Sequence, residues 1–181
     1  MLKKVFLLYK TPLLISIVLS IVLVALKAQS HYLQLSLILL GSLAGTFFLD
    51  LDYIIYAYFL DPGSSFSQTL KGFLRHKDLY HAGSYIYYNE DQIKEKTLNS
   101  ALFQIVLTAL MVFVVGSGAN FLLKALVLSV FISSIYRMQL NYIKGKSEEW
   151  FWALKSKPNK NAFVLYTTVL LGIFVYCLSI F

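Results

Sequence analysis

The stretch from residue 98 to residue 136 reads LNSALFQIVLTALMVFVVGSGANFLLKALVLSVFISSIY, and its only charged residue is Lys124. It divides into two apolar runs, 98–115 and 119–136, each long enough to cross a bilayer as a helix. The turn Gly116-Ser117-Gly118 joins them, and a connection this short predicts an antiparallel pair of helices. The stretch therefore predicts an all-α membrane protein.

Three further apolar runs extend this prediction to about five transmembrane helices. They cover residues 12–29, 32–49 and 162–181, and we expect a single polytopic bundle over residues 1–181. Only 14% of the chain is charged and its mean hydropathy is +0.67, whereas a soluble domain carries about a quarter charged residues. The first run could also be a signal peptide ending at Ala28, but Lys27 makes a poor cleavage site and favours a retained helix.

Basic residues predict how the chain is oriented. Of the 16 lysines and arginines, all but Lys27 and Lys124 precede the first run or lie in the polar segments 50–97 and 137–161. Positive charge marks the cytoplasmic side, so we expect a cytoplasmic N-terminus and two cytoplasmic loops in the inner (plasma) membrane. Because these charges are spread over the loops, they indicate membrane lipid as a partner and argue against nucleic acid.

Small residues predict close helix packing. Gly41 and Gly45 lie four residues apart in the second run, where they would let another helix approach closely, and a homodimer through this face is a further possibility. In the fourth run, Ala125, Ser129 and Ser133 recur every four residues and form a second small face.

Four side chains near the end of the second run could bind a metal. Asp50 and Asp52 follow the apolar residues directly, and His76 and His81 come later in the same polar segment. Oxygen and nitrogen ligands of this kind suit zinc or manganese. On a regular helix the two aspartates would point about 200° apart, so they converge only if the backbone turns there.

The two motifs together resemble those of the YdjM-like family, which are LexA-regulated, inner-membrane-associated proteins proposed to be metal-dependent hydrolases. The run Phe48-Leu49-Asp50-Leu51-Asp52-Tyr53 is similar to the family's Leu-Pro-Asp-x-Asp-His motif. The run His76-Lys77-Asp78-Leu79-Tyr80-His81-Ala82 is similar to its His-Arg-Gly-x-Thr-His-Ser motif. Three family ligands are missing, because Tyr53 replaces a histidine and Ser134 and Met138 stand where a later helix carries His-x-x-x-Asp.

The resemblance implies metal-assisted hydrolysis of a phosphoester or other lipid-like substrate at the cytoplasmic face. The two aspartates and two histidines would bind the metal, which lowers the pKa of a bound water. Asp78 would accept a proton or orient a histidine. Lys71, Arg75 and Lys77 would hold an anionic headgroup, unless they only set the topology.

Two other classes of function remain open on the sequence. The missing ligands are also compatible with a catalytically degenerate membrane scaffold or partner-binding protein. A small transport or channel component is a third option, although the apolar runs carry no series of charged residues of the kind that transport pathways often need.

Overall fold

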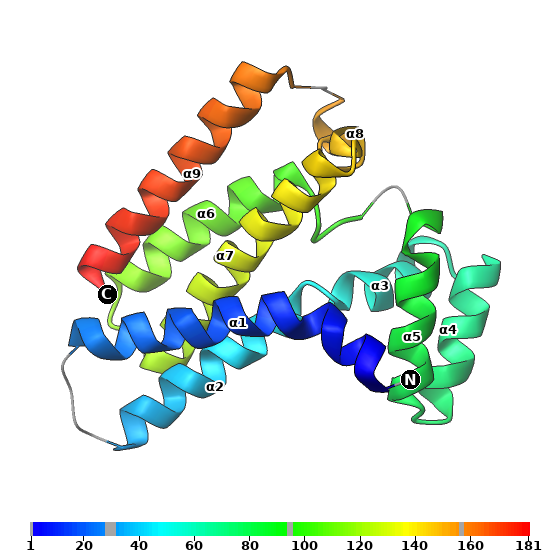
Figure 1. Cartoon of the computed structure of the whole chain (residues 1–181), viewed down its shortest axis with the longest axis horizontal. Helices are drawn as coiled ribbons and strands as arrows, with labels where there is room; N and C mark the ends of the chain where they lie inside the picture. Colours follow the sequence, from blue (N-terminus) through cyan, green and yellow to red (C-terminus); the bar gives the residue numbers. More distant parts are fainter. Residues whose placement is uncertain (1, 28–31, 94–95, 156–157) are drawn as a thin grey trace.

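The structure is a computed structural model that describes residues 2–27, 32–93, 96–155 and 158–181, with side chains from Tyr9 onward. Within these ranges every regular element is a helix, as the sequence predicts. Figure 1 shows α1 and α2 side by side, α7 crossing them, α6 alongside α7, and α9 alongside α6. These five are the apolar helices: α1 (Leu2–Lys27), α2 (Tyr32–Phe48), α6 (Ala101–Gly116), α7 (Phe121–Ile143) and α9 (Lys160–Ile180).

Length and composition allow three or four of these helices to cross a membrane. Tyr9–Lys27 of α1 and the whole of α7 and α9 are apolar and long enough. The fourth candidate is α2 together with the next helical segment, which meet at a bend of 46°. Helix α6 has 16 residues, and at 1.5 Å per residue it extends about 24 Å, less than the hydrocarbon thickness of about 30 Å.

The contact between α2 and α7 holds the centre of the bundle. A Cβ added at Gly45 would lie 2.6 Å from the Cβ of Ser129 and 2.8 Å from the Leu126 carbonyl oxygen, so only glycine allows this approach. The hydroxyl of Ser129 donates to the Ser42 carbonyl oxygen at 2.6 Å and lies 3.1 Å from the Ser16 hydroxyl of α1. The two predicted small faces therefore pack against each other within one chain.

The homodimer prediction concerns the same glycine face. Gly41 meets the α7 backbone at Leu122, and both it and Gly45 are buried in the chain. A dimer through these glycines stays a prediction, and it would require α7 to move away from α2.

The polar segment between the second and third apolar runs folds into short helices. It contains α3 (Leu51–Ile55), the π-helix η1 (Tyr56–Leu60), α4 (Ser65–Arg75), α5 (Leu79–Asn89) and the 3₁₀ turn η2 (Glu90–Gln92). Its apolar side chains form a small core of their own around Phe66 and Leu70. In Figure 1 the α4–α5 hairpin lies beside the bundle, near the N-terminal end of α1.

Several boundaries differ from the sequence prediction. Helix α1 begins at Leu2, ten residues before the predicted start of the first run at residue 12. The third helix begins at Ala101 rather than residue 98, because the Ser100 hydroxyl caps it by accepting from the Phe103 N–H at 3.2 Å. The fourth continues to Ile143, so the first seven residues of the predicted loop 137–161 are helical. The rest of that segment contains α8 (Ser147–Trp150) and the 3₁₀ turn η3 (Trp152–Leu154).

Candidate functional site

Asp50 lies at the bend between α2 and α3 and is bound by side chains from two other helices. Its Oδ1 is 2.7 Å from Nη2 of Arg137 on α7, and its Oδ2 accepts a hydrogen bond from the Tyr9 hydroxyl of α1 at 2.9 Å. The side chains are 24% exposed for Asp50 and 19% for Arg137, so the ion pair is largely shielded from water. Both carboxylate oxygens therefore have partners within the protein.

Asp52 is 2% exposed and binds the segment that leads into α6. Its Oδ1 accepts from the backbone N–H of Thr97 at 2.9 Å, and its Oδ2 accepts from the backbone N–H of Asn99, also at 2.9 Å. The Asn99 side-chain amide donates to the same Oδ2 at 2.8 Å and to the Leu49 carbonyl oxygen at 3.0 Å. A buried carboxylate needs such donors, and here the N–H groups of one loop supply them.

Hydrogen bonds through Arg137 and Asn99 connect these two aspartates. Nη1 of Arg137 donates to Oδ1 of Asn99 at 3.2 Å, while Asn99 donates to Asp52. We call the five connected residues the polar latch: Tyr9, Asp50, Asp52, Asn99 and Arg137. It joins α1, the α2–α3 bend, the start of α6 and the end of α7.

The predicted histidines lie on the α4–α5 hairpin. His76 follows the last residue of α4, and Lys77 turns the chain with a φ of 57°. Asp78 caps α5 by accepting from the His81 backbone N–H at 3.1 Å, and its Oδ2 lies 2.7 Å from Nδ1 of His81. These hydrogen bonds lower the pKa of the Asp78 carboxyl group.

The two predicted halves of the metal site do not meet in this fold. No group of three or more His, Cys, Asp or Glu side chains placed for a metal occurs among the residues that the structure describes. Asp50 and Asp52 already bind protein donors, and the histidines are exposed on a separate hairpin. The zinc or manganese site therefore stays a prediction, and its four ligands could share one metal only if the hairpin and the bend came together.

The predicted substrate-binding cations also lie on the hairpin. Lys71 donates to the Pro62 carbonyl oxygen at 3.2 Å, and its Nζ lies 5.2 Å from the centre of the Tyr58 ring. Arg75 and Lys77 are exposed near the α4–α5 turn. None of the three lines the polar cavity described next.

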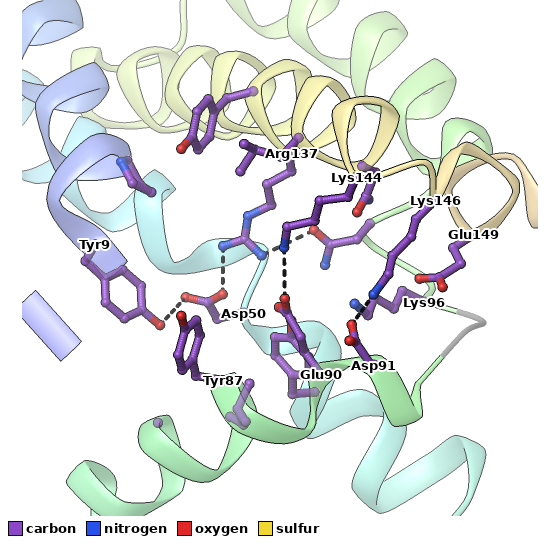
Figure 2. Close-up of a pocket in the computed structure, with 18 residues that line it drawn as sticks. Tyr9, Asp50, Tyr87, Glu90, Asp91, Lys96, Arg137, Lys144, Lys146 and Glu149 are labelled. Carbon is purple, nitrogen blue, oxygen red and sulfur yellow. Dashed lines mark hydrogen bonds and ion pairs between the residues drawn. The ribbon is translucent and has the colours of Figure 1, made fainter. Parts of the chain in front are cut away.

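That cavity, of about 170 Å³, opens beside the polar latch. Figure 2 shows its charged groups, which come from the bend, η2, the Lys96 segment, the end of α7 and the chain after it. Four cations, four carboxylates and four tyrosines line it. The tyrosines are Tyr9, Tyr53, Tyr87 and Tyr136. The cations are Lys96, Arg137, Lys144 and Lys146, and the carboxylates are Asp50, Glu90, Asp91 and Glu149. Its formal charge is therefore balanced.

Most of these charges are paired across the cavity. Nζ of Lys144 lies 3.2 Å from Oε1 of Glu90, and the Lys146 ammonium pairs with Asp91. The Lys146 ammonium lowers the pKa of the Asp91 carboxyl, and Asp91 raises the pKa of Lys146. Burial lowers the pKa of Lys96, whose Nζ lies 5.6 Å from the centre of the Tyr53 ring.

The sequence interpretation missed the role of Arg137 and Asn99. By its position in the sequence Arg137 indicates only a topology-setting charge, although it lies in the segment where the resembled family carries a metal ligand. One signal was available: the predicted topology places Arg137 at the same membrane boundary as Asp50, where opposite charges pair.

Comparison of the chain with known protein families, with curated proteins and with solved structures finds no match in any of the three. The fold and the site define a helical membrane protein with a charge-balanced cavity beside a structural polar latch.

Proposed function

We propose that this protein is a non-catalytic, multi-pass membrane protein that binds a polar ligand or partner in the charged cavity. The observation that carries the proposal is the Arg137 guanidinium 2.7 Å from Asp50. A metal ion would give that carboxylate a positive partner, and here a side chain of the same protein supplies one. Asp52 is likewise satisfied by N–H groups, so the motif contributes to the fold rather than to chemistry.

The proposed topology has five membrane crossings and a cytoplasmic N-terminus, with the cavity on the cytoplasmic side. Two observations support it. The cavity contains Lys96, Lys144 and Lys146, and basic residues mark the cytoplasmic side. At the other end of the bundle Nζ of Lys27 lies 5.7 Å from the centre of the Phe121 ring and 5.8 Å from that of Phe181, so helix ends predicted to be external come together.

Labelling of single cysteines tests this topology. Cys177 is buried in α9 and is the only cysteine, so a Cys177→Ser variant provides the background. A cysteine at Ser117 should react with an impermeant maleimide from outside the cell, and one at Thr69, an exposed position on α4, only after the membrane is opened. The reverse pattern would contradict the proposed orientation.

A second candidate is a metal-dependent hydrolase at the inner membrane, and one observation favours it. The Asp78 carboxylate at 2.7 Å from Nδ1 fixes the His81 ring and leaves Nε2 for a ligand, as in many metal sites. This function would require the α4–α5 hairpin to approach the α2–α3 bend and Arg137 to release Asp50.

Metal analysis of the purified protein separates the two candidates. After incubation with zinc and manganese and removal of excess ions, we expect well under one ion per chain, and no difference between the unmodified protein and its Asp52→Asn and His81→Ala variants. One ion per chain that both substitutions abolish, in variants that remain folded, would replace the binding proposal with the hydrolase.

A further inference from the structure

A second hollow lies next to the charged cavity and is apolar. It has a volume of about 320 Å³ and runs along α1 from Thr11 to Val22, with Ile132 of α7 and Phe174 and Leu178 of α9 closing it. Val18, at its middle, is 53% exposed. In the proposed topology this groove faces the hydrocarbon of the bilayer.

The groove and the charged cavity are lined by neighbouring residues of the same two helices. On α1, Pro12 lines the cavity and its neighbour Thr11 lines the groove. On α7, Tyr136 lines the cavity and Ile132, about one helical turn earlier, lines the groove. A molecule with a polar and an apolar part can therefore occupy both without leaving the protein surface.

The dimensions match one lipid chain in one leaflet. From Thr11 to Val22 the helix rises about 16 Å, and half of the hydrocarbon core of a bilayer is about 15 Å thick. The cavity lies at the N-terminal end of this groove, which the proposed topology places at the level of the headgroups.

The charges that line the cavity indicate which lipid headgroup would fit it. Arg137, Lys144 and Lys146 each have a carboxylate partner. Among the described residues Lys96 and Glu149 form no direct ion pair, although Glu149 is close enough to raise the pKa of Lys96 against the effect of burial; Figure 2 shows both beside Lys146. A cation and a carboxylate that lie near each other in one cavity complement the two charges of a zwitterion.

We propose that the cavity and the groove together bind one zwitterionic glycerophospholipid of the ethanolamine type, its phosphate at Lys96, its ammonium at Glu149 and one acyl chain along α1. This inference rests on the proposed binding function and names its ligand. The four tyrosines of the cavity lining suit an ammonium group as well, because aromatic faces attract cations.

Native mass spectrometry of the full chain in detergent tests the proposal. The probes are phosphatidylethanolamine and phosphatidylglycerol with identical acyl chains, and soluble glycerophosphoethanolamine. We expect one phosphatidylethanolamine per chain, bound about tenfold more tightly than phosphatidylglycerol, because a charged hydrogen bond to the ammonium is lost with the second lipid.

Paired variants distinguish binding of the lipid headgroup from binding of the acyl chain. Lys96→Met should weaken both lipids, and Glu149→Gln should remove only the preference for ethanolamine, whereas the exposed Lys160→Met should change neither. Val18→Trp, which fills the groove, should reduce binding about tenfold or more relative to Val175→Trp on an exposed face of α9.

Three results would overturn the proposal. These are equal binding of the two lipids, binding unchanged by both Lys96→Met and Val18→Trp, and binding of glycerophosphoethanolamine as tight as that of the lipid. If the lipid measurements fail and the purified protein is metal-free, the proposed binding function still stands. If the metal analysis finds one ion per chain, that function is wrong whatever the lipid measurements show.

Discussion

Breaking the ion pair between Asp50 and Arg137 should show directly that these side chains depend on each other. The atoms lie 2.7 Å apart, and the side chains are 24% and 19% exposed. Two unit charges about 4 Å apart attract by about 4 kcal/mol at an effective dielectric constant of about 20. Partial exposure and the cost of desolvation reduce this to a coupling free energy of about 2 kcal/mol.

A double-mutant cycle measures that coupling. Asp50→Asn and Arg137→Gln should each lower the melting temperature in detergent by about 4 to 8 °C, since about 2 to 4 °C corresponds to 1 kcal/mol in a chain of this size. The double variant should lose about 2 kcal/mol less than the sum of the two single losses.

The exposed pair of Lys146 and Asp91 provides the matched control. Asp91 is 70% exposed, so an equivalent cycle on this pair should give a coupling of about 0 to 1 kcal/mol. If the Asp50 and Arg137 effects simply add, to within about 0.5 kcal/mol, the interpretation of this pair as a structural link is wrong.

Three further substitutions test the packing, the latch and a surface pair. Gly45→Ala brings a Cβ within 2.8 Å of the α7 backbone and should cost about 1 to 3 kcal/mol by thermal unfolding, whereas Gly172→Ala, with nothing within 4 Å, should cost nothing. Asp52→Ala leaves two backbone N–H groups without their acceptor and should cost about 2 to 4 kcal/mol. The Lys146 ammonium holds the pKa of Asp91 below its ordinary value. The contribution of this pair to the free energy of unfolding is therefore present above about pH 4 and is lost as the pH falls through the lowered pKa. Because the pair is exposed this loss should be small, and Asp91→Asn should abolish it.

Each of these predictions has a contrary result. Equal effects of the two glycine substitutions would mean that α2 and α7 are not in close contact. A neutral Asp52→Ala would mean that the segment before α6 does not depend on this carboxylate. An acid transition that persists unchanged in Asp91→Asn would assign it to another group.

The helices themselves follow from the sequence because each depends on local composition. An apolar run bounded by glycines or polar caps predicts a helix, and all five runs contain one. The close contact at Gly45 was predictable in kind, because only a small residue allows helix backbones to approach. Its partner on α7 was not specified, since several helices could have filled the same place.

Where α7 ends could not be predicted from hydropathy alone. Arg137 is a charged residue, and a prediction based on apolar length stops before it. In the fold its charge is met by Asp50, which is 87 residues away in the chain, so the helix continues to Ile143. Only a long-range contact decides this boundary.

The partners of the predicted metal ligands could not be predicted for the same physical reason. Asp50 and Asp52 have the residue type and the membrane position of ligands, and nothing near them in the sequence indicates other partners. Asn99 and Arg137, which bind them, come from distant segments. A motif identifies side chains that can bind a cation, but not whether the cation is a metal or an arginine.

The most direct test of the central claim is the melting temperature of the purified protein with EDTA, with zinc and with manganese. A metal that bound the folded chain at about a hundred times its dissociation constant would add about 2.7 kcal/mol, or about 5 to 11 °C. Because protein donors satisfy Asp50 and Asp52, we expect the same melting temperature in all three conditions. A rise of this size with either metal, lost in Asp52→Asn, would contradict the account.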